Sequence, residues 1–222
     1  MLFFGVLAPI IHAQTVPSNS FCTNVGGADP KQNPCAQAAG NLTFYCQHDD
    51  RWRKNPYACE NMSGAGCGPT TMAMVLSAYG MTLTPAQIAE MFTPQFSVCN
   101  VGTDMVSALG KGEKPNRSFI DQVGLEVGKN ILINGKLDLD LAQEYLRPSS
   151  GYLIIGSSIN FPTCGCGHIF VIQAADPTSN MIKIRDPNNC SISSPEERPS
   201  GIDYPVSKIT SWLFAYPVKK VK

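Results

Sequence analysis

The chain has 222 residues, which is enough for one domain or for one domain with a short appendage. Hydrophobic residues make up 43% and charged residues 15%, so a full core can form and disorder of the whole chain is excluded. Lys+Arg and Asp+Glu both number 17, and this balance argues against a nucleic-acid partner. No apolar run reaches the roughly 18 residues that a membrane span needs, so we expect no span in the mature chain.

The first residues resemble a secretory signal. Residues 2–11 form an apolar run, and Ala13 offers a small residue before a cleavage point. An N-terminal anchor and an apolar tail are the other interpretations. We expect an export signal over residues 1–13 and a protein that is secreted, periplasmic or held at the cell surface.

The cysteine count favours the same compartment. Nine cysteines are many for this length, and disulfides persist in oxidising spaces. Because the number is odd, we expect four bridges and one free thiol, with the pairing left open. The cysteines are Cys22, Cys35, Cys46, Cys59, Cys67, Cys99, Cys164, Cys166 and Cys190.

The first half of the chain predicts helices. Residues 14–43 are rich in turn-forming residues and predict an irregular, cysteine-containing leader before a domain over residues 44–222. Pro69 suits a first helical turn, and Gly80 suits the end of that helix. Thr84 starts a capping-box motif that predicts a second helix. We expect further helices over residues 119–127 and 139–146.

The second half predicts strands. Apolar runs at residues 152–155, 168–172 and 181–184 are typical of buried strands, and residues 176–180 predict a turn between the last two. Residues 212–218 predict a closing strand near a sheet edge, because Pro217 lacks an N–H. Helices followed by strands indicate an α+β domain whose helices pack against an antiparallel sheet.

Cys67 is placed unlike the other cysteines. It lies between Gly66 and Gly68 at the start of the most regular helix. The flanking glycines allow close approach to the sulfur, and the helix N-terminus favours the reactive thiolate. The free N–H groups there can also stabilise an oxyanion. We therefore expect Cys67 to be the free thiol and a nucleophile.

A cysteine nucleophile needs a base, and the chain has three histidines. His12 falls in the expected signal, and His48 falls in a polar loop. His168 opens an apolar strand, where a rigid backbone can hold a general base.

An acidic side chain is expected to orient that base. Asp186 ends the strand that follows the turn at residues 176–180, so it should lie beside His168 at one end of a hairpin. We expect its carboxylate to accept the Nδ1–H of His168 and fix the tautomer. Asp176 is the rival acid, but it would lie at the opposite end of the hairpin.

The segment from Gly66 to Leu76, GCGPTTMAMVL, resembles the nucleophile motif of the bacteriocin-processing double-glycine leader peptidases, a papain-like family with many stand-alone relatives. The segments GHIFVI, which contains His168, and Asp186-Pro187 are similar to the family's histidine strand and acidic residue. The segment YCQHDDRW, which contains Gln47, is similar to a segment of the stand-alone relatives.

The resemblance covers residues 44–218 and implies a papain-like cysteine peptidase that hydrolyses peptide bonds. It implies that Cys67 is the nucleophile, His168 the base, Asp186 the orienting acid and Gln47 an oxyanion donor. We expect a peptide or protein substrate, no cofactor, no metal and a monomer. Cys46 beside Gln47, and Cys164 and Cys166 before His168, depart from the family pattern. They indicate disulfides that stabilise these segments.

The sequence also allows three other interpretations of the function. Cys164, Cys166 and His168 could ligand zinc, but their spacing is tighter than usual zinc motifs. The chain could instead be an inactive, disulfide-rich binding module of the same fold, because a fold does not fix a function. It could also be an amidase or transpeptidase that acts on cell-wall peptide with the same residues.

Overall fold

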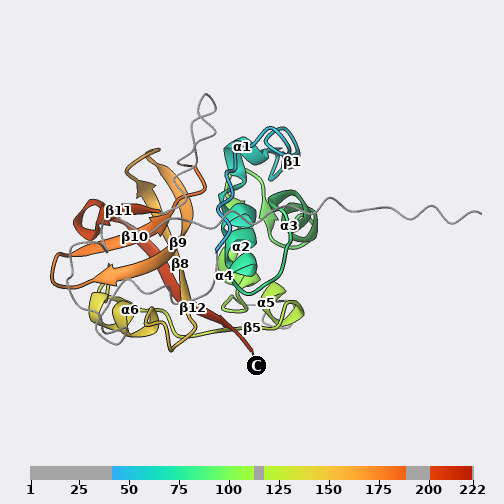
Figure 1. Ribbon diagram of the computed structural model, residues 1–222. Coiled ribbons are helices and arrows are strands. Elements are labelled where there is room, and N and C mark those ends of the chain that lie inside the picture. The colour runs from blue at the N-terminus through green and yellow to red at the C-terminus, as the bar shows by residue number, and fades with distance from the viewer. Residues whose placement is uncertain (1–41, 113–117, 189–200, 222) are drawn as a thin grey trace, which may run out of the picture.

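The computed structural model describes residues 42–112, 118–188 and 201–221. Helices gather on one side of the molecule and a long sheet on the other, with α2 lying next to the sheet (Figure 1). The expected signal over residues 1–13 and nearly all of the leader over residues 14–43 lie outside the described residues. The described part holds no helix with the length and apolar character of a membrane span.

The helical side is built around one regular helix. Short two-stranded ladders flank it. The elements are β1 (Pro56–Tyr57), β2 (Glu60–Asn61), α1 (Met62–Ala65), α2 (Cys67–Ala78), α3 (Pro85–Phe92), β3 (Ser97–Val98), β4 (Gly102–Thr103), α4 (Met105–Ala108) and α5 (Phe119–Gln122).

The sheet side is a six-stranded sheet in the order β11-β10-β9-β8-β12-β5, with every neighbouring pair antiparallel. Helix α6 packs on β8 and β9. The elements are β5 (Leu125–Val127), β6 (Leu132–Ile133), β7 (Lys136–Leu137), α6 (Leu139–Tyr145), β8 (Leu153–Phe161), β9 (Cys166–Asp176), β10 (Met181–Arg185), β11 (Ile202–Pro205), the 3₁₀ helix η2 (Val206–Lys208) and β12 (Trp212–Lys220). The expected α+β fold, with helices against an antiparallel sheet, is confirmed.

Helix α2 ends where the sequence predicts. Gly80 adopts φ +82°, and the N–H of Met81 donates to the Leu76 carbonyl, as in a Schellman cap. Helix α3 begins with the predicted capping box, in which Thr84 and Gln87 exchange hydrogen bonds. These local signals fix where the helix that carries Cys67 ends and where the next helix begins.

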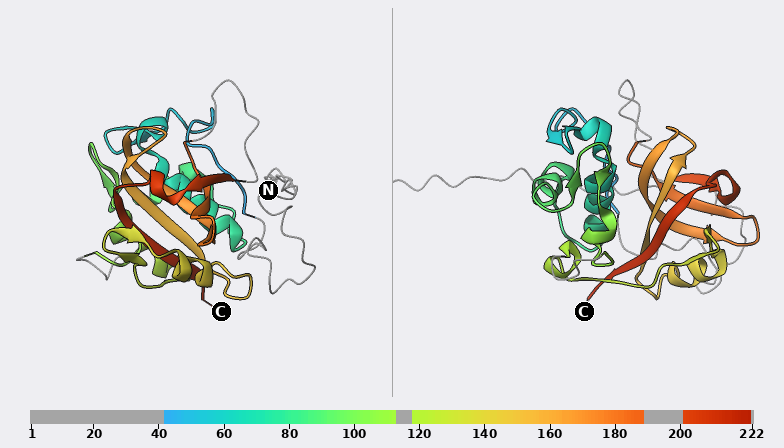
Figure 2. Two further views of the ribbon diagram at one scale, coloured as in Figure 1. Left: turned by 90° about the vertical axis from the view of Figure 1, so that its left-hand side faces the viewer. Right: turned by 180° about the vertical axis from the view of Figure 1, so that it is seen from behind.

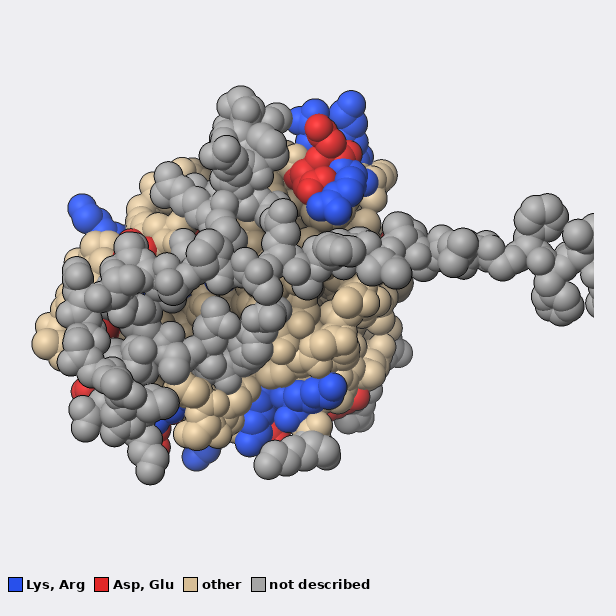
Figure 3. Space-filling view, viewed as in Figure 1, with Lys and Arg blue, Asp and Glu red and all other residues tan. Residues whose placement is uncertain are grey.

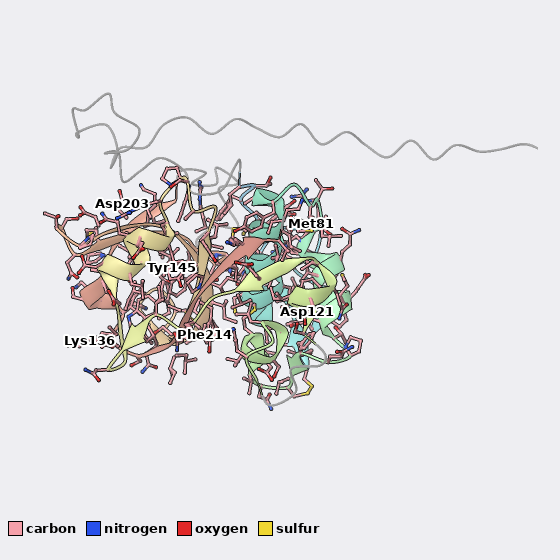
Figure 4. All side chains as sticks on the ribbon, turned by 90° about the horizontal axis from the view of Figure 1, so that it is seen from below. Met81, Asp121, Lys136, Tyr145, Asp203 and Phe214 are labelled. Atoms are coloured by element: carbon pink, nitrogen blue, oxygen red, sulfur yellow. A yellow bond between two sulfur atoms is a disulfide. The ribbon has the colours of Figure 1, made fainter. Side chains whose placement is uncertain are left out.

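The sheet separates two cores. Along β9, Ile169 and Val171 pack with the helices, whereas Phe170 and Ile172 pack on the opposite face with α6. This alternation is the period-two pattern of a strand. Figure 2 shows β12 crossing from the helical side to the sheet, and Figure 4 shows Phe214 of β12 between the two sides. The sheet is therefore buried on both faces, which makes its strands a rigid support.

One expectation about an element is wrong. The helix predicted over residues 119–127 stops at Gln122, because Gly124 adopts φ +64° and Leu125–Val127 pairs with β12 instead. The closing strand β12 lies near an edge of the sheet as expected, because only the short strand β5 lies outside it. Pairing with β5 starts at Val218, so Pro217 precedes that ladder and does not interrupt it.

Charged side chains of opposite sign lie together on the surface. Asp49 pairs with Arg51 at 2.6 Å, and Asp50 pairs with Arg53 at 2.6 Å. In the face seen in Figure 3, acidic and basic atoms mix above the helical side where grey atoms leave the surface visible. Charges of opposite sign on this part of the surface thus form close pairs.

Candidate functional site

Cys67 is the first residue of α2 and is half-buried. Among the described residues it is the free cysteine. The first N–H groups of a helix have no partner within the helix, and the helix dipole places partial positive charge there. Pro69 has no N–H, and the N–H of Thr70 donates to the carbonyl of Gly66. The structure therefore puts a free thiol at the positively polarised start of a helix, as the sequence predicts.

Helix α2 is hydrogen-bonded to strand β9 one turn after Cys67. The buried hydroxyl of Thr71 donates to the carbonyl oxygen of Ile169 at 3.0 Å. Ile169 follows His168 directly, and residues four apart lie on the same face of a helix. This one bond sets the position of the Cys67 end of the helix against the His168 end of the strand.

The opposite side of the helix start is packed against Thr103. A Cβ built at Gly68 would lie 2.5 Å from the Cβ of Thr103. Thr103 cannot easily give way, because its hydroxyl is hydrogen-bonded to the buried hydroxyl of Tyr57 at 2.7 Å. Gly68 is thus needed for close packing against Thr103, and this contact helps to hold the start of the helix in place.

Replacing Gly68 with alanine should lower the free energy of unfolding by about 1–3 kcal/mol, the usual effect of overpacking. The gain in helix propensity of about 1 kcal/mol offsets part of this loss. Gly167→Ala is the matched control, because a Cβ there meets no atom within 4 Å. Urea unfolding of both variants measures the difference, and equal stability of the two would show that Thr103 moves aside freely.

His168 is held in β9 with its ring against aromatic side chains. Its ring centroid lies 4.9 Å from that of Phe161 and 6.2 Å from that of Phe170. Its carbonyl oxygen accepts a hydrogen bond from Ser157 in the neighbouring strand at 2.9 Å. The side chain is only 3% exposed, so the imidazole has little freedom to turn.

Asp186 follows β10 and contacts the imidazole of His168. His168 Nε2 lies 2.6 Å from Asp186 Oδ1, and both side chains are buried. The prediction that these residues meet at one end of a hairpin is therefore confirmed by the pairing of β9 with β10. The predicted ring nitrogen is wrong. Asp186 contacts Nε2 and not Nδ1, because the orientation of the buried ring sets which nitrogen meets the acid, and the sequence pattern does not contain that orientation.

Cys67 also lies near enough to the imidazole to act on its pKa. Since Nε2 is used by Asp186, Nδ1 is the nitrogen left to serve Cys67. Burial is the largest influence on the pKa of His168 and lowers it. The hydrogen bond to Asp186 and the negative charges of Asp186 and Cys67 more than offset this, so the pKa of His168 rises to about 9. These surroundings favour the protonated imidazole.

Gln47 is buried and lies beside the segment that follows Asp186. Its side-chain Nε2 donates to the carbonyl oxygen of Ser63 at 2.7 Å, in the short helix that precedes Cys67. Its backbone N–H donates to the carbonyl of Pro187 at 2.9 Å. One hydrogen of Nε2 remains beyond the bond to Ser63. The four residues singled out in the sequence are therefore gathered from α2, β9, the end of β10 and the segment before α1.

The family follows from a comparison with known proteins. Residues 40–199 match the model of the Peptidase_C39 like family, which is most of the chain. The chain belongs to the C39-like peptidase family. The resemblance seen in the Cys67, His168 and Asp186 motifs is confirmed, and the family supports a cysteine peptidase with a papain-like fold.

Two solved structures are similar to this C39-like chain. One, described as a C39-like peptidase of Bacillus anthracis, is 15% identical with a TM-score of 0.49, covering 84% of this chain and 99% of that one. The other is the peptidase domain of Streptococcus ComA, a bi-functional ABC transporter involved in a quorum-sensing pathway. It is 17% identical with a TM-score of 0.44, covering 71% of this chain and 93% of that one. No curated protein sequence matches the chain significantly.

Disulfides border the site of this C39-like chain. Cys164 is bonded to Cys166, just before His168, and Cys59 is bonded to Cys99. Cys46, beside Gln47, is also disulfide-bonded. The bond between Cys164 and Cys166 leaves neither sulfur as a thiolate for the zinc cluster considered from the sequence. Within the described ranges, no group of three His, Cys, Asp or Glu residues is placed to hold a metal ion.

Sequence reasoning missed a second histidine at the site. The sequence predicts only that His48 lies in a polar loop. In the structure both of its ring nitrogens are hydrogen-bonded, one to Ser63 and one to Asn188. The partners lie 15 and 140 residues away in the chain. Only the position of His48 directly after Gln47 could have drawn attention to it, because no local pattern predicts so distant a contact.

Proposed function

We propose that this chain is an exported, monomeric cysteine peptidase that hydrolyses peptide bonds with Cys67, His168, Asp186 and Gln47. The observation that carries the proposal is the row in which Asp186 is hydrogen-bonded to His168 and the free thiol of Cys67 lies near enough to act on the same imidazole. A free cysteine at a helix N-terminus with an oriented imidazole is the arrangement that nucleophilic catalysis by a thiol requires. The C39-like family of the chain supports the same chemistry.

The first half of the reaction breaks the peptide bond. The sulfur of Cys67, having given its proton to Nδ1 of His168, attacks the carbonyl carbon of the substrate. The negative charge moves to the carbonyl oxygen, where the N–H of Cys67 and the Nε2 of Gln47 stabilise it. As the carbon–nitrogen bond breaks, His168 gives its proton to the leaving amine. A thioester on Cys67 and a free amine result.

The second half of the reaction hydrolyses the thioester and restores the free enzyme. A water molecule gives a proton to His168 as its oxygen attacks the thioester carbon. The same donors stabilise the oxyanion, and the bond to sulfur breaks to release a carboxylic acid. Asp186 holds the ring through Nε2 in both halves and stabilises the charge that the ring carries. These residues, the backbone N–H of Cys67 and one water molecule account for every step, so the proposed reaction requires no cofactor.

Export is supported by the disulfides. The bonds Cys59–Cys99 and Cys164–Cys166 are of a kind that persists in oxidising compartments. Together with the apolar run at residues 2–11, they favour a secreted, periplasmic or surface location. Cys67 would be the thiol kept reduced for catalysis in that setting.

The function is tested by digestion of a peptide library with the full chain, followed by mass spectrometry of the products. Cleavage at defined peptide bonds is the expected result. Binding of peptides without cleavage would favour the inactive module, and products joined to an added amine would favour a transferase. Either of these results would overturn peptide hydrolysis as the function.

Replacing Gln47 with alanine should lower kcat by about 10²–10³-fold, the usual loss when one oxyanion donor is removed. KM should change little, because the donor acts mainly on the charge that develops in the reaction. Steady-state kinetics on one library peptide measure both constants. A rise in KM with unchanged kcat would assign Gln47 to substrate binding instead.

A further inference from the structure

His48 bridges two segments that belong to the site. Its Nε2 lies 2.5 Å from the side-chain oxygen of Asn188, and its Nδ1 lies 2.6 Å from the hydroxyl of Ser63. A neutral imidazole donates from one nitrogen and accepts at the other. Nε2–H therefore donates to Asn188, and the hydroxyl of Ser63 donates to Nδ1. Both needs of the ring are met without water.

The bridge continues to the carboxylate that holds His168. The backbone N–H of Asn188 donates to Asp186 Oδ1 at 2.8 Å, and the same oxygen accepts the bond from His168. The side chain and the backbone of Asn188 thus join His48 to Asp186. Two hydrogen bonds onto one carboxylate oxygen define its direction more narrowly than one bond does.

The other end of the bridge reaches Gln47. Ser63 accepts from the Nε2 of Gln47 through its carbonyl and contacts His48 through its hydroxyl. The backbone of Gln47 is bonded to Pro187, which lies between Asp186 and Asn188. Together these bonds link residues 47–48, residues 186–188 and Ser63 into one closed hydrogen-bond network. Movement of any one segment would therefore disturb both Gln47 and Asp186.

We propose that His48 is a positioning residue that locks the Asp186 loop to the Gln47 segment, so that the orienting acid and the oxyanion donor keep their places together. This inference rests on the proposed function, since it assigns a role within the same site. The hydrogen bonds of the His48 ring go to Asn188 and Ser63, so His48 acts on Asp186 and Gln47 through these two residues.

The test is a double-mutant cycle with His48→Ala, Asn188→Ala and the double variant. Each single change should lower kcat roughly tenfold with KM nearly unchanged, which is the upper range for one hydrogen bond. The double variant should be no slower than either single variant, because both remove one bridge. His48→Gln, which keeps an N–H donor, should recover part of the loss. Asp50→Ala is the control in the same loop, because its side chain is exposed and pairs with Arg53.

The pH profile separates positioning from simple loss of stability. A less well-aligned Asp186 stabilises the His168 imidazolium less, so the basic limb of kcat/KM should move to lower pH in the His48 and Asn188 variants and stay fixed in Asp50→Ala. Additive losses in the double variant, or a basic limb that does not move, would overturn the proposal. Loss of thermal stability with unchanged kcat would also overturn it.

A second readout keeps the inference separate from the proposed function. If the wild-type chain cleaves no peptide, the proposed function fails, but alkylation of Cys67 by iodoacetamide still reports the state of the site. Slower alkylation in His48→Ala and in Asn188→Ala, by the same factor, would support the positioning role. Alkylation at the wild-type rate in both variants would contradict it.

Discussion

Replacing Cys67 with alanine should abolish peptide cleavage, with a loss in kcat of about 10⁶-fold, as when the nucleophile of a peptidase is removed. Without the sulfur no thioester can form, and the donors that remain stabilise only the slow attack of water. Digestion of the same peptide library measures the loss. The change should leave the fold intact, because alanine suits a helix and Cys67 is only half-buried.

The serine variant is the matched control. Cys67→Ser keeps the shape of the side chain but offers a hydroxyl, which is a much weaker nucleophile beside an imidazole suited to a thiol. It should bind peptides as the wild type does and cleave them very slowly. Cleavage by Cys67→Ala at more than roughly a thousandth of the wild-type rate, which is far above the residue of a 10⁶-fold loss, would remove Cys67 from the mechanism.

Replacing Asp186 with alanine should lower kcat/KM by roughly 10²–10⁴-fold, in the range found when the orienting acid of a triad is changed. The bond from Asp186 Oδ1 to His168 Nε2 both orients the ring and stabilises its charge. Asp186→Asn is the matched control. It can still accept the bond to the ring but lacks the charge, so its loss should be smaller.

The pH profile of these variants follows from the pKa of His168. Burial lowers this pKa, and Asp186 with Cys67 raises it to about 9. Without the carboxylate, the lowering effect of burial on the pKa of His168 is no longer offset by Asp186. The pKa therefore falls, and the basic limb of kcat/KM moves to lower pH. Measurement of kcat/KM across neutral and alkaline pH checks this. A basic limb that stays near pH 9 in both Asp186 variants would mean that the carboxylate does not act on His168.

The same pKa predicts how stability depends on pH. The folded protein holds the proton of His168 more tightly than the unfolded chain, whose histidine has a pKa near 6.5. The resulting stabilisation is fully present below pH 6.5 and is lost as the pH rises to about 9. The urea midpoint of the wild type should therefore fall over this range, and it should fall less in a His168→Ala variant.

Local signals in the sequence predicted the elements that carry the site. Gly80 and the Thr84 capping box set the ends of helices, and the turn at residues 176–180 joins β9 to β10 as expected. That hairpin alone brings His168 near Asp186. These features depend on residues close together in the chain, so the sequence pattern contains them.

Features that depend on distant residues were missed. The end of α5 is decided by pairing of Leu125–Val127 with β12, more than 90 residues later, as the match of Val127 with Val218 shows. The ring nitrogen that contacts Asp186 depends on how Phe161 and Phe170 pack around His168. The bridge through His48 depends on Asn188, 140 residues away. Tertiary packing sets each of these, and a local pattern carries no information about it.

The central claim is that Cys67 is a free thiol activated by His168. Labelling of the folded chain with iodoacetamide under non-reducing conditions, followed by peptide mapping, tests it most directly. We predict that the label falls on Cys67 and that labelling slows when His168 is replaced with alanine. Recovery of Cys67 in a disulfide, or labelling at the same rate without His168, would contradict the account.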